Sequence, residues 1–330
     1  MRCSTHGSVW HDRSGPVTIL ARPEMGADPL AAKTSASIWR DTLANVLRQR
    51  SAVVGLTILA ILFLTAIFAP LIATHDPILS LRDQGETGIT RGEPPCIHLL
   101  GCPADQPQHL MGIDSVVRDE FSRVVYGSRV SLQIGFVTVG FAIIIGSFIG
   151  AIAGFVGGWA DNVLMRLMDV VLSFPSLILA IAIVSVLGYG LTNAQLAIGI
   201  VSIPIYARVM RASVLSVREA DFVVASRALG ESSVGILSRR VLPNALTPLI
   251  VQGTLGIGGA ILEVAALSFV GLGAEPPIAE WGSMISLDRN LFFSSPHLIL
   301  FPGIAITLCV LGFNLLGDGL RDALDPRLNR

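Results

Sequence analysis

Long apolar stretches without charged residues dominate the hydrophobic pattern of this chain. Asp, Glu, Lys and Arg are all missing from five of them: 51–75, 130–160, 170–207, 241–262 and 290–317. Each stretch can form a span, because a helix needs about 20 apolar residues to cross the ~30 Å hydrocarbon core of a bilayer. The apolar runs are continuous rather than alternating, which favours membrane helices over the strands of a membrane barrel.

The third stretch is too long for one span, and a turn signal, Gly-Tyr-Gly-Leu-Thr-Asn, occupies 188–193 in its middle. We therefore expect an all-α polytopic membrane protein with six transmembrane helices. Their approximate positions are 53–74, 131–156, 168–187, 194–212, 244–272 and 298–318.

Composition and charge agree with this fold class and add an orientation. Hydrophobic residues make up 52% of the chain and charged residues 14%, against roughly 25% charged in soluble domains. The net charge of −1 offers no basic face for a nucleic acid. Basic residues near the span ends number fourteen on the side of the termini and six on the other side. The positive-inside rule therefore predicts that both termini are cytoplasmic.

These predictions divide the chain into five parts. The parts are a cytoplasmic tail at 1–50, a first transmembrane helix at 51–75, an extracytoplasmic loop with an insert at 76–128, a five-helix transmembrane domain at 129–320 with a cytoplasmic loop at 213–243, and a cytoplasmic tail at 321–330. The polar tail at 1–50 does not have the pattern of a cleaved signal peptide.

The chain carries no recognisable catalytic motif. None of its six histidines lies inside a predicted span, where an intramembrane protease needs its catalytic groups. It also lacks the Gly-x-x-x-x-Gly-Lys-Ser/Thr phosphate loop. We expect a non-catalytic protein, in which any ATP hydrolysis belongs to another polypeptide.

Cys96 and Cys102 lie close together in the predicted outer loop. A disulfide suits the oxidising side of a bacterial membrane, and we predict one. Free thiols are one alternative, and a metal site that uses His98 and His109 is another. The ligand spacing matches no standard zinc pattern, so we predict no metal.

The cytoplasmic segment between the fourth and fifth predicted spans has the most specific pattern. Apolar residues at 222–229 recur with helical spacing, and Gly230 is a candidate C-terminal cap. The polar residues at 231–233 can begin a second short helix, and Pro243 precedes the fifth span. We predict two short helices joined by a glycine bend. A solvated basic loop that only fixes topology is the alternative.

This segment resembles the Glu-Ala-Ala loop of ABC importer permeases. Val224 replaces the acidic residue of that loop, and Arg240 stands where a branched apolar residue is usual. The remaining matches are Ala225, Ser226, Gly230, Leu242 and Pro243.

Other segments resemble the dipeptide, oligopeptide and nickel permeases of the second, or C, kind. Within the first of them, Ile113 and Val117 replace the usual Thr and Gly. The resemblance covers about 40–330, apart from an insert at roughly 83–107. Its segments are 109–132, 267–273, 276–277, 281–282 and 313–327.

The resemblance implies a type I ABC importer transmembrane domain in the bacterial inner membrane. Such a chain forms half of a translocation path for di- and oligopeptides or related solutes. The implied partners are a second permease in a heterodimer, two cytoplasmic ABC ATPase subunits and an extracytoplasmic solute-binding protein. ATP and Mg would be bound by the ATPase subunits and no cofactor by this chain. The implied ATPase-coupling residues are Phe222, Val224, Ala225, Ser226, Arg227, Gly230, Leu242 and Pro243.

A secondary transporter and a channel subunit are the alternatives to an ATP-driven importer. A secondary transporter usually carries ionisable groups at mid-membrane, and a channel subunit needs a repeated pore-lining pattern. Neither feature is evident. Glu263 lies in an otherwise uncharged region, where it either faces the translocation path or makes a structural hydrogen bond; we favour the second. Arg166 and Asp169 are spaced to pair on one helix face.

Overall fold

The computed structural model describes residues 46–103 and 106–324, and the described part is helical without strands. Two isolated β-bridges join Cys96 to His109 and Ile113 to Asp119. The predicted all-α fold class is confirmed. The elements are α2 (Arg50–Ile67), α3 (Ala69–Ile72), η1 (His98–Leu100), α4 (Glu120–Val156), α5 (Gly158–Leu172), α6 (Ser176–Leu187), α7 (Leu191–Arg218), α8 (Asp221–Ala228), α9 (Ser233–Gly235), the π-helix η2 (Ile236–Val241), α10 (Leu242–Ala245), α11 (Thr247–Phe269), α12 (Trp281–Asp288), η3 (Arg289–Leu291) and α13 (His297–Leu324).

Five of these helices are long and apolar enough to cross a membrane: α2, α4, α7, α11 and α13. They correspond to the first, second, fourth, fifth and sixth predicted spans. α5 and α6 together form a sixth candidate span that is bent by 91° at its break.

The prediction of one continuous helix at 168–187 for the third span is wrong. α5 already begins at Gly158, between the second and third predicted spans, and ends at Leu172. α6 begins after Pro175, which has no N–H to continue the helix and disfavours a helical conformation in Phe174 before it. The sequence signal for this break is therefore the proline.

The ends of several helices also differ from the prediction. α2 stops at Ile67, and α3 follows it with Pro70 in its first turn. α4 begins at Glu120, inside the predicted loop 76–128, because the Asp119 side chain caps its first turn by accepting from Ser122 N–H. α13 continues to Leu324, into the predicted tail 321–330. The predicted N-terminal tail lies outside the described residues up to position 45.

Glycines allow α4 and α7 to pack at close range. Gly146, Gly150 and Gly154 repeat every fourth residue on α4 and lie against the backbone of α7. A Cβ added at Gly146 would stand 2.7 Å from the carbonyl oxygen of Ile203, and one at Gly154 would stand 2.9 Å from that of Arg211. This spacing is the small-residue pattern by which membrane helices approach each other.

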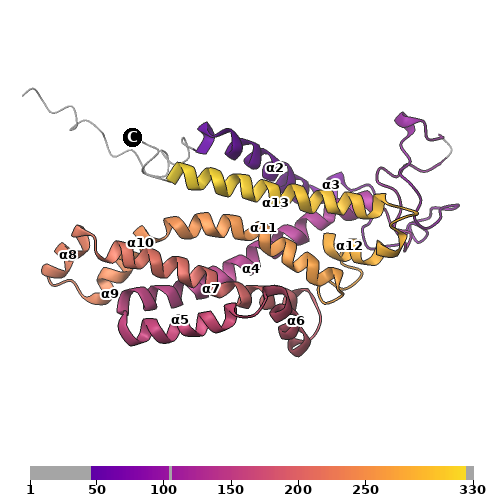
Figure 1. The fold of residues 1–330 in the computed structure, drawn as a ribbon. Coiled ribbons are helices and arrows are strands. Elements are labelled where there is room, and N and C mark those ends of the chain that lie inside the picture. The colour runs from indigo at the N-terminus through magenta and orange to yellow at the C-terminus, as the bar shows by residue number, and fades with distance from the viewer. Residues whose placement is uncertain (1–45, 104–105, 325–330) are drawn as a thin grey trace, which may run out of the picture. The chain divides into compact units, whose positions relative to one another are not determined.

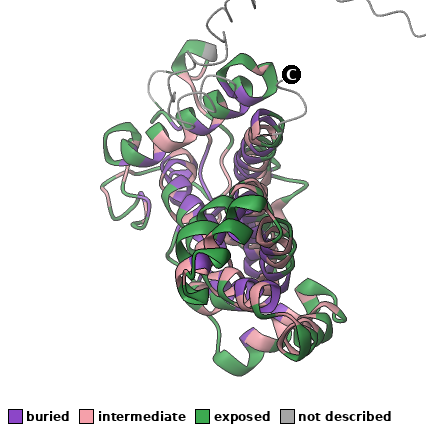
Figure 2. Ribbon diagram, turned by 90° about the vertical axis from the view of Figure 1, so that its left-hand side faces the viewer, coloured by how far each residue is buried: buried purple, intermediate pink, exposed green. Residues whose placement is uncertain are grey.

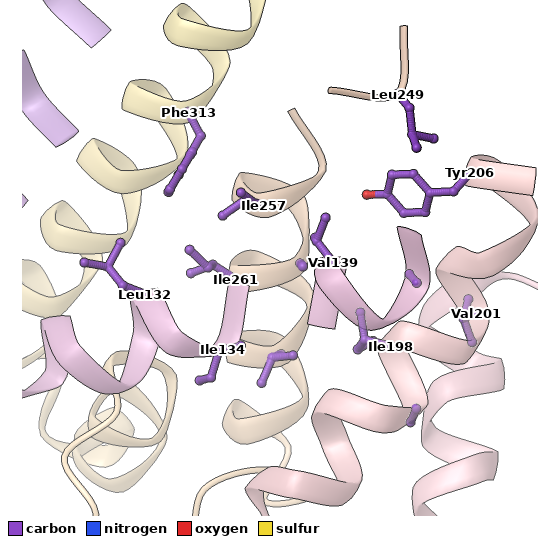
Figure 3. Close-up of a cluster of buried hydrophobic side chains, with 14 of the residues drawn as sticks. Leu132, Ile134, Val139, Ile198, Val201, Tyr206, Leu249, Ile257, Ile261 and Phe313 are labelled. Atoms are coloured by element: carbon purple, nitrogen blue, oxygen red, sulfur yellow. The ribbon is translucent and has the colours of Figure 1, made fainter. Parts of the chain in front are cut away.

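Buried apolar side chains form the core, and those labelled in Figure 3 come from four helices. The outer faces of the bundle expose large apolar side chains such as Ile144 on α4 and Val186 on α6, as expected of surfaces that meet lipid. The labelled core residues are Leu132, Ile134 and Val139 on α4, Ile198, Val201 and Tyr206 on α7, Leu249, Ile257 and Ile261 on α11, and Phe313 on α13.

The helices place two different structures at opposite ends of the bundle (Figure 1). α8, α9 and α10 lie at one end, whereas α12 and the segment 76–119 lie at the other. The second end has its own small core of Leu81, Ile89, Ile113 and Val117. A buried ion pair, with Arg118 Nε 2.7 Å from Asp114 Oδ2, accompanies it. The short helices α8, α9 and α10 and the segment 76–119 are therefore considered as two separate candidate sites.

Candidate functional site

The bend after α8 has the geometry of a glycine-terminated helix. Gly230 has φ +81°, in the left-handed region that glycine adopts without steric cost. The backbone N–H of Glu231 donates to the carbonyl oxygen of Ser226 at 3.2 Å, and that of Leu229 donates to Ala225 at 3.0 Å. These bonds satisfy carbonyl groups that the helix end would otherwise leave unpaired. The structure thus places the bend at the predicted glycine.

The return segment starts with a side-chain cap. Gly235 N–H donates to Ser232 Oγ at 3.2 Å, so the polar start predicted at 231–233 is present. Arg240 Nε lies 3.3 Å from Glu231 Oε2, an ion pair between the bend and η2. This pair gives a structural reason for an arginine at a position where the resembling loop has an apolar residue.

The segment has a buried inner side and an exposed outer side. Val223, Ile236 and Val241 are fully buried and anchor it to the bundle. Figure 2 views the molecule from this end and shows exposed residues gathered there. We define the coupling surface by its exposed side chains Phe222, Val224, Ala225, Arg227, Leu229 and Val234.

Leu229 and Val234, which the sequence analysis did not single out, are 88% and 76% exposed. A surface on which several large apolar side chains are exposed indicates an interaction site. Of the other predicted coupling residues, Ser226 is half-buried and its Oγ donates to Phe222 O at 2.9 Å. Leu242 is half-buried at the start of α10, and Pro243 is exposed.

Hydrogen bonds connect the two ends of the segment 219–245, which contains the coupling surface, to the long helices. Ser213 Oγ on α7 donates to Ala245 O on α10 at 2.8 Å. Arg218 Nη1, at the end of α7, donates to Gly154 O on α4 at 2.9 Å, while its Nε donates to Glu219 Oε1 at 3.0 Å.

A polar cavity opens between α5 and α7. Arg211 makes a bidentate ion pair with Asp161, at 2.5 and 2.6 Å, and Arg208 Nη2 lies 2.5 Å from Asp169 Oδ1. The cavity measures about 790 Å³, and the residues lining it are Asp161, Asn162, Met165, Arg166, Asp169, Arg208 and Arg211.

The predicted Arg166–Asp169 pair on one helix face is wrong. Asp169 pairs instead with Arg208 from α7, because α5 lies against that helix. Sequence reasoning missed both inter-helix pairs since their partners are 39 and 50 residues apart.

Glu263 lies on α11 beside the break between α5 and α6. It is half-buried, and Ser176 Oγ at the start of α6 donates to Glu263 Oε1 at 3.3 Å. The hydrogen bond matches the structural role that we favoured, and the partial exposure leaves the carboxylate open to one side. In the segment 76–119, the structure joins Cys96 to Cys102 by a disulfide with a Cα–Cα distance of 5.4 Å.

Two protein families together match most of the chain. Residues 146–330 match the family described as binding-protein-dependent transport system inner membrane component. Residues 37–92 match the N-terminal transmembrane domain of oligopeptide transport permease C.

Individual relatives are similar over nearly the full length. The dipeptide transport system permease protein DppC of Alkalihalophilus pseudofirmus is 46% identical over 94% of this chain and 97% of its own. The glutathione transport system permease protein GsiD of Escherichia coli O6:K15:H31 is 39% identical over 88% of this chain and 91% of its own.

A solved structure shares the fold. The inward-facing MetNI methionine ABC transporter contains a chain that superposes with a TM-score of 0.52 at 20% identity, over 62% of this chain and 97% of that one. At this identity the likeness shows the fold alone, a type I ABC importer transmembrane domain. The chain is a multi-pass inner membrane protein and belongs to the binding-protein-dependent transport system inner membrane components, in the branch that includes the DppC and GsiD permeases.

Proposed function

We propose that this chain forms half of the translocation path of an ATP-driven peptide importer and receives the force of ATP hydrolysis through the coupling surface. The observation behind the proposal is an exposed apolar surface on a segment that buried side chains attach to the bundle. Leu229, the C-cap of α8, is 88% exposed, whereas Val223 within α8 is fully buried. A helix of this kind suits docking into a groove of a partner protein.

The partner in this proposal is a cytoplasmic ABC ATPase subunit. Small Ala225 permits close approach, and exposed Arg227 can pair with acidic groups in the groove. Closure of two ATPase subunits would move α8, and the bonds of Ser213 and Arg218 would pass the movement to α7 and α4. The spans would then alternate between inward-open and outward-open states as rigid bodies.

The other half of the path is a second permease subunit that faces α5 and α6. α5 has no buried residue in the described chain, although it carries the ion pairs of Asp161 and Asp169. Charged groups at membrane depth are costly when they face lipid, and they are characteristic of solute pathways. The polar cavity between α5 and α7 therefore supports a path on this face, covered by the sister subunit.

Di- and oligopeptides are the proposed solutes, because the relatives DppC and GsiD are named as dipeptide and glutathione permeases. An extracytoplasmic solute-binding protein would deliver them to the end that carries α12 and the segment 76–119. Both termini and the coupling surface would then lie in the cytoplasm. In this arrangement the chain is non-catalytic, and ATP and Mg are held by the ATPase subunits.

Reconstitution of the importer tests the proposal. The complex of this chain with its sister permease, ATPase subunits and binding protein is placed in proteoliposomes, and peptide-stimulated ATP hydrolysis is measured. Ala225→Glu should abolish the stimulation because the larger charged side chain prevents seating, while the matched control Ala225→Ser should keep it. Normal stimulation in Ala225→Glu would contradict the coupling role.

The same vesicles test the solute. Uptake of a labelled dipeptide should be inhibited by unlabelled di- and tripeptides and unaffected by a nickel chelate. Inhibition by the chelate alone would contradict the peptide assignment while leaving the coupling result intact.

A further inference from the structure

Four ionisable side chains from separate parts of the sequence meet at the outer end of the bundle. His75 follows α3, Glu86 and His109 lie in the segment 76–119, and Asp119 is the N-cap of α4. His109 and Asp119 are buried, and His75 and Glu86 are about one-fifth exposed. We call these four residues the histidine–carboxylate cluster.

The two carboxylates occupy opposite sides of the two imidazole rings. Glu86 lies on the Nε2 side, with Oε1 3.0 Å from His75 Nε2 and Oε2 3.2 Å from His109 Nε2. Asp119 lies on the Nδ1 side, with Oδ1 3.1 Å from His109 Nδ1 and Oδ2 3.8 Å from His75 Nδ1. Both rings are thus held between the same two acidic groups.

We propose that the cluster is a binding site for a divalent transition-metal ion of the Zn²⁺ class, ligated by His75 Nδ1, His109 Nδ1 and the Asp119 carboxylate. One ligand atom from each of these residues lies within 4.8 Å of the others. Ligand atoms of a tetrahedral site stand about 3.3 Å apart at metal–nitrogen distances of ~2.0 Å. The 3.1 and 3.8 Å separations to Asp119 lie on either side of that value.

Glu86 supplies the outer support that such a site needs. Metal-bound histidines nearly always donate the other ring N–H to a carboxylate or carbonyl group, which fixes the tautomer. With protons on both Nε2 atoms facing Glu86, the Nδ1 atoms of His75 and His109 carry free lone pairs on the Asp119 side. Two rings oriented by one carboxylate is the arrangement expected of ligands to one ion.

The charge of the cluster also indicates a cation. His109 Nε2 and Glu86 Oε2 face each other at 3.2 Å, on the side away from the proposed ligand atoms. Within the described residues, neither Glu86 nor Asp119 has an ion pair with an arginine or lysine. With neutral imidazoles the cluster therefore has a charge of about −2, which a divalent ion would cancel.

Ser122 and Thr74 make the remaining contacts of the cluster. Asp119 Oδ2 accepts hydrogen bonds from Ser122 N at 2.8 Å and Ser122 Oγ at 2.6 Å, which leaves Oδ1 to face His109. Thr74 Oγ1 lies 2.9 Å from His75 Nδ1 and 3.3 Å from Asp119 Oδ2, where it can supply a fourth oxygen.

An ion here would fasten three pieces of the outer end to each other: the end of α3, the segment 76–119 and the first turn of α4. The disulfide between Cys96 and Cys102 lies beside the proposed metal site, since Cys96 forms a β-bridge with His109. The metal ion and the disulfide would together rigidify the surface that faces the extracytoplasmic side in the proposed orientation. Binding of the ion does not depend on the proposed transport function.

Metal analysis of the purified full-length chain tests this site. The chain is prepared in detergent with an affinity tag free of histidine, stripped with EDTA, and dialysed against buffered Zn²⁺. Mass spectrometry of the bound metal should find about one Zn²⁺ per chain. Substituted Co²⁺ should give the intense visible absorption bands of a tetrahedral site.

Variants assign the ligands. His75→Gln should lose the stoichiometric Zn²⁺, and Glu86→Gln should weaken Zn²⁺ binding by about 10- to 100-fold through its effect on the histidines. His98→Gln is the matched control, because His98 is an exposed histidine of the same segment outside the cluster. It should bind Zn²⁺ like the wild type.

Two results would overturn the proposal: a folded wild-type chain that binds no Zn²⁺ or Co²⁺ above background, or a His75→Gln variant that binds as the wild type does. Elution in the monodisperse peak of the wild type establishes that each variant is folded.

Discussion

Substitutions at Gly230 test whether the bend itself couples ATP hydrolysis to transport. A Cβ at this position would meet no atom within 4 Å, so the effect of a new side chain comes from the backbone alone. At φ +81° an ordinary L-residue costs roughly 1–2 kcal/mol. If the bend is required, Gly230→Ala should lower its population about 5- to 30-fold, since 1.4 kcal/mol is a factor of ten.

A matched series separates conformation from side-chain chemistry. Gly230→Asn should keep most activity, because Asn tolerates the left-handed region. Gly230→Pro should remove activity, because proline fixes φ near −65° and removes the N–H that donates to Arg227 O at 3.1 Å.

The assay is peptide-stimulated ATP hydrolysis by the reconstituted importer, normalised to the amount of assembled complex. The predicted order of activity is Gly, Asn, Ala, Pro. Wild-type stimulation in Gly230→Pro, or an equal loss in Asn and Pro variants, would refute the requirement for a left-handed bend.

Three further predictions concern the bundle. Gly150→Ala should destabilise the chain by about 1–3 kcal/mol through overlap with α7, whereas Gly140→Ala, with open space around its Cβ, should not; equal unfolding temperatures would contradict the close packing. Arg211→Gln should lower transport because it leaves the Asp161 carboxylate unpaired, and adding Asp161→Asn should restore part of the rate; no rescue in uptake assays would argue against the pair. Glu263→Gln should keep near-normal peptide uptake because the amide oxygen still accepts from Ser176, and lost uptake at normal abundance would assign Glu263 to the path.

Local signals made the coupling segment predictable from the sequence. The bend needs a residue that accepts positive φ, and Gly230 supplies it two residues before the Ser232 cap. The residues that define this shape are close in sequence, so their pattern can be recognised without knowledge of the tertiary structure. The long spans were predictable for the same reason, since charge-free stretches define them.

Features that depend on contacts between distant segments were not predictable. The break between α5 and α6, by contrast, has a local signal in Pro175, and it was missed because apolar content continues across this proline and length alone suggested one span. The Asp161–Arg211 pair joins two helices whose packing no single-sequence pattern specifies. The ligands of the proposed metal site come from irregular backbone, where neither helical nor strand periodicity indicates which histidine meets which carboxylate.

Crosslinking at the coupling surface tests the central claim most directly. A benzoylphenylalanine placed at Leu229, 88% exposed beside the bend, is activated by light in the assembled importer. The same probe at Phe293, 96% exposed near α12, is the control at the opposite end. We predict a crosslink to the ATPase subunit from position 229 and none from position 293. No ATPase crosslink from 229 in an actively transporting complex would contradict the claim.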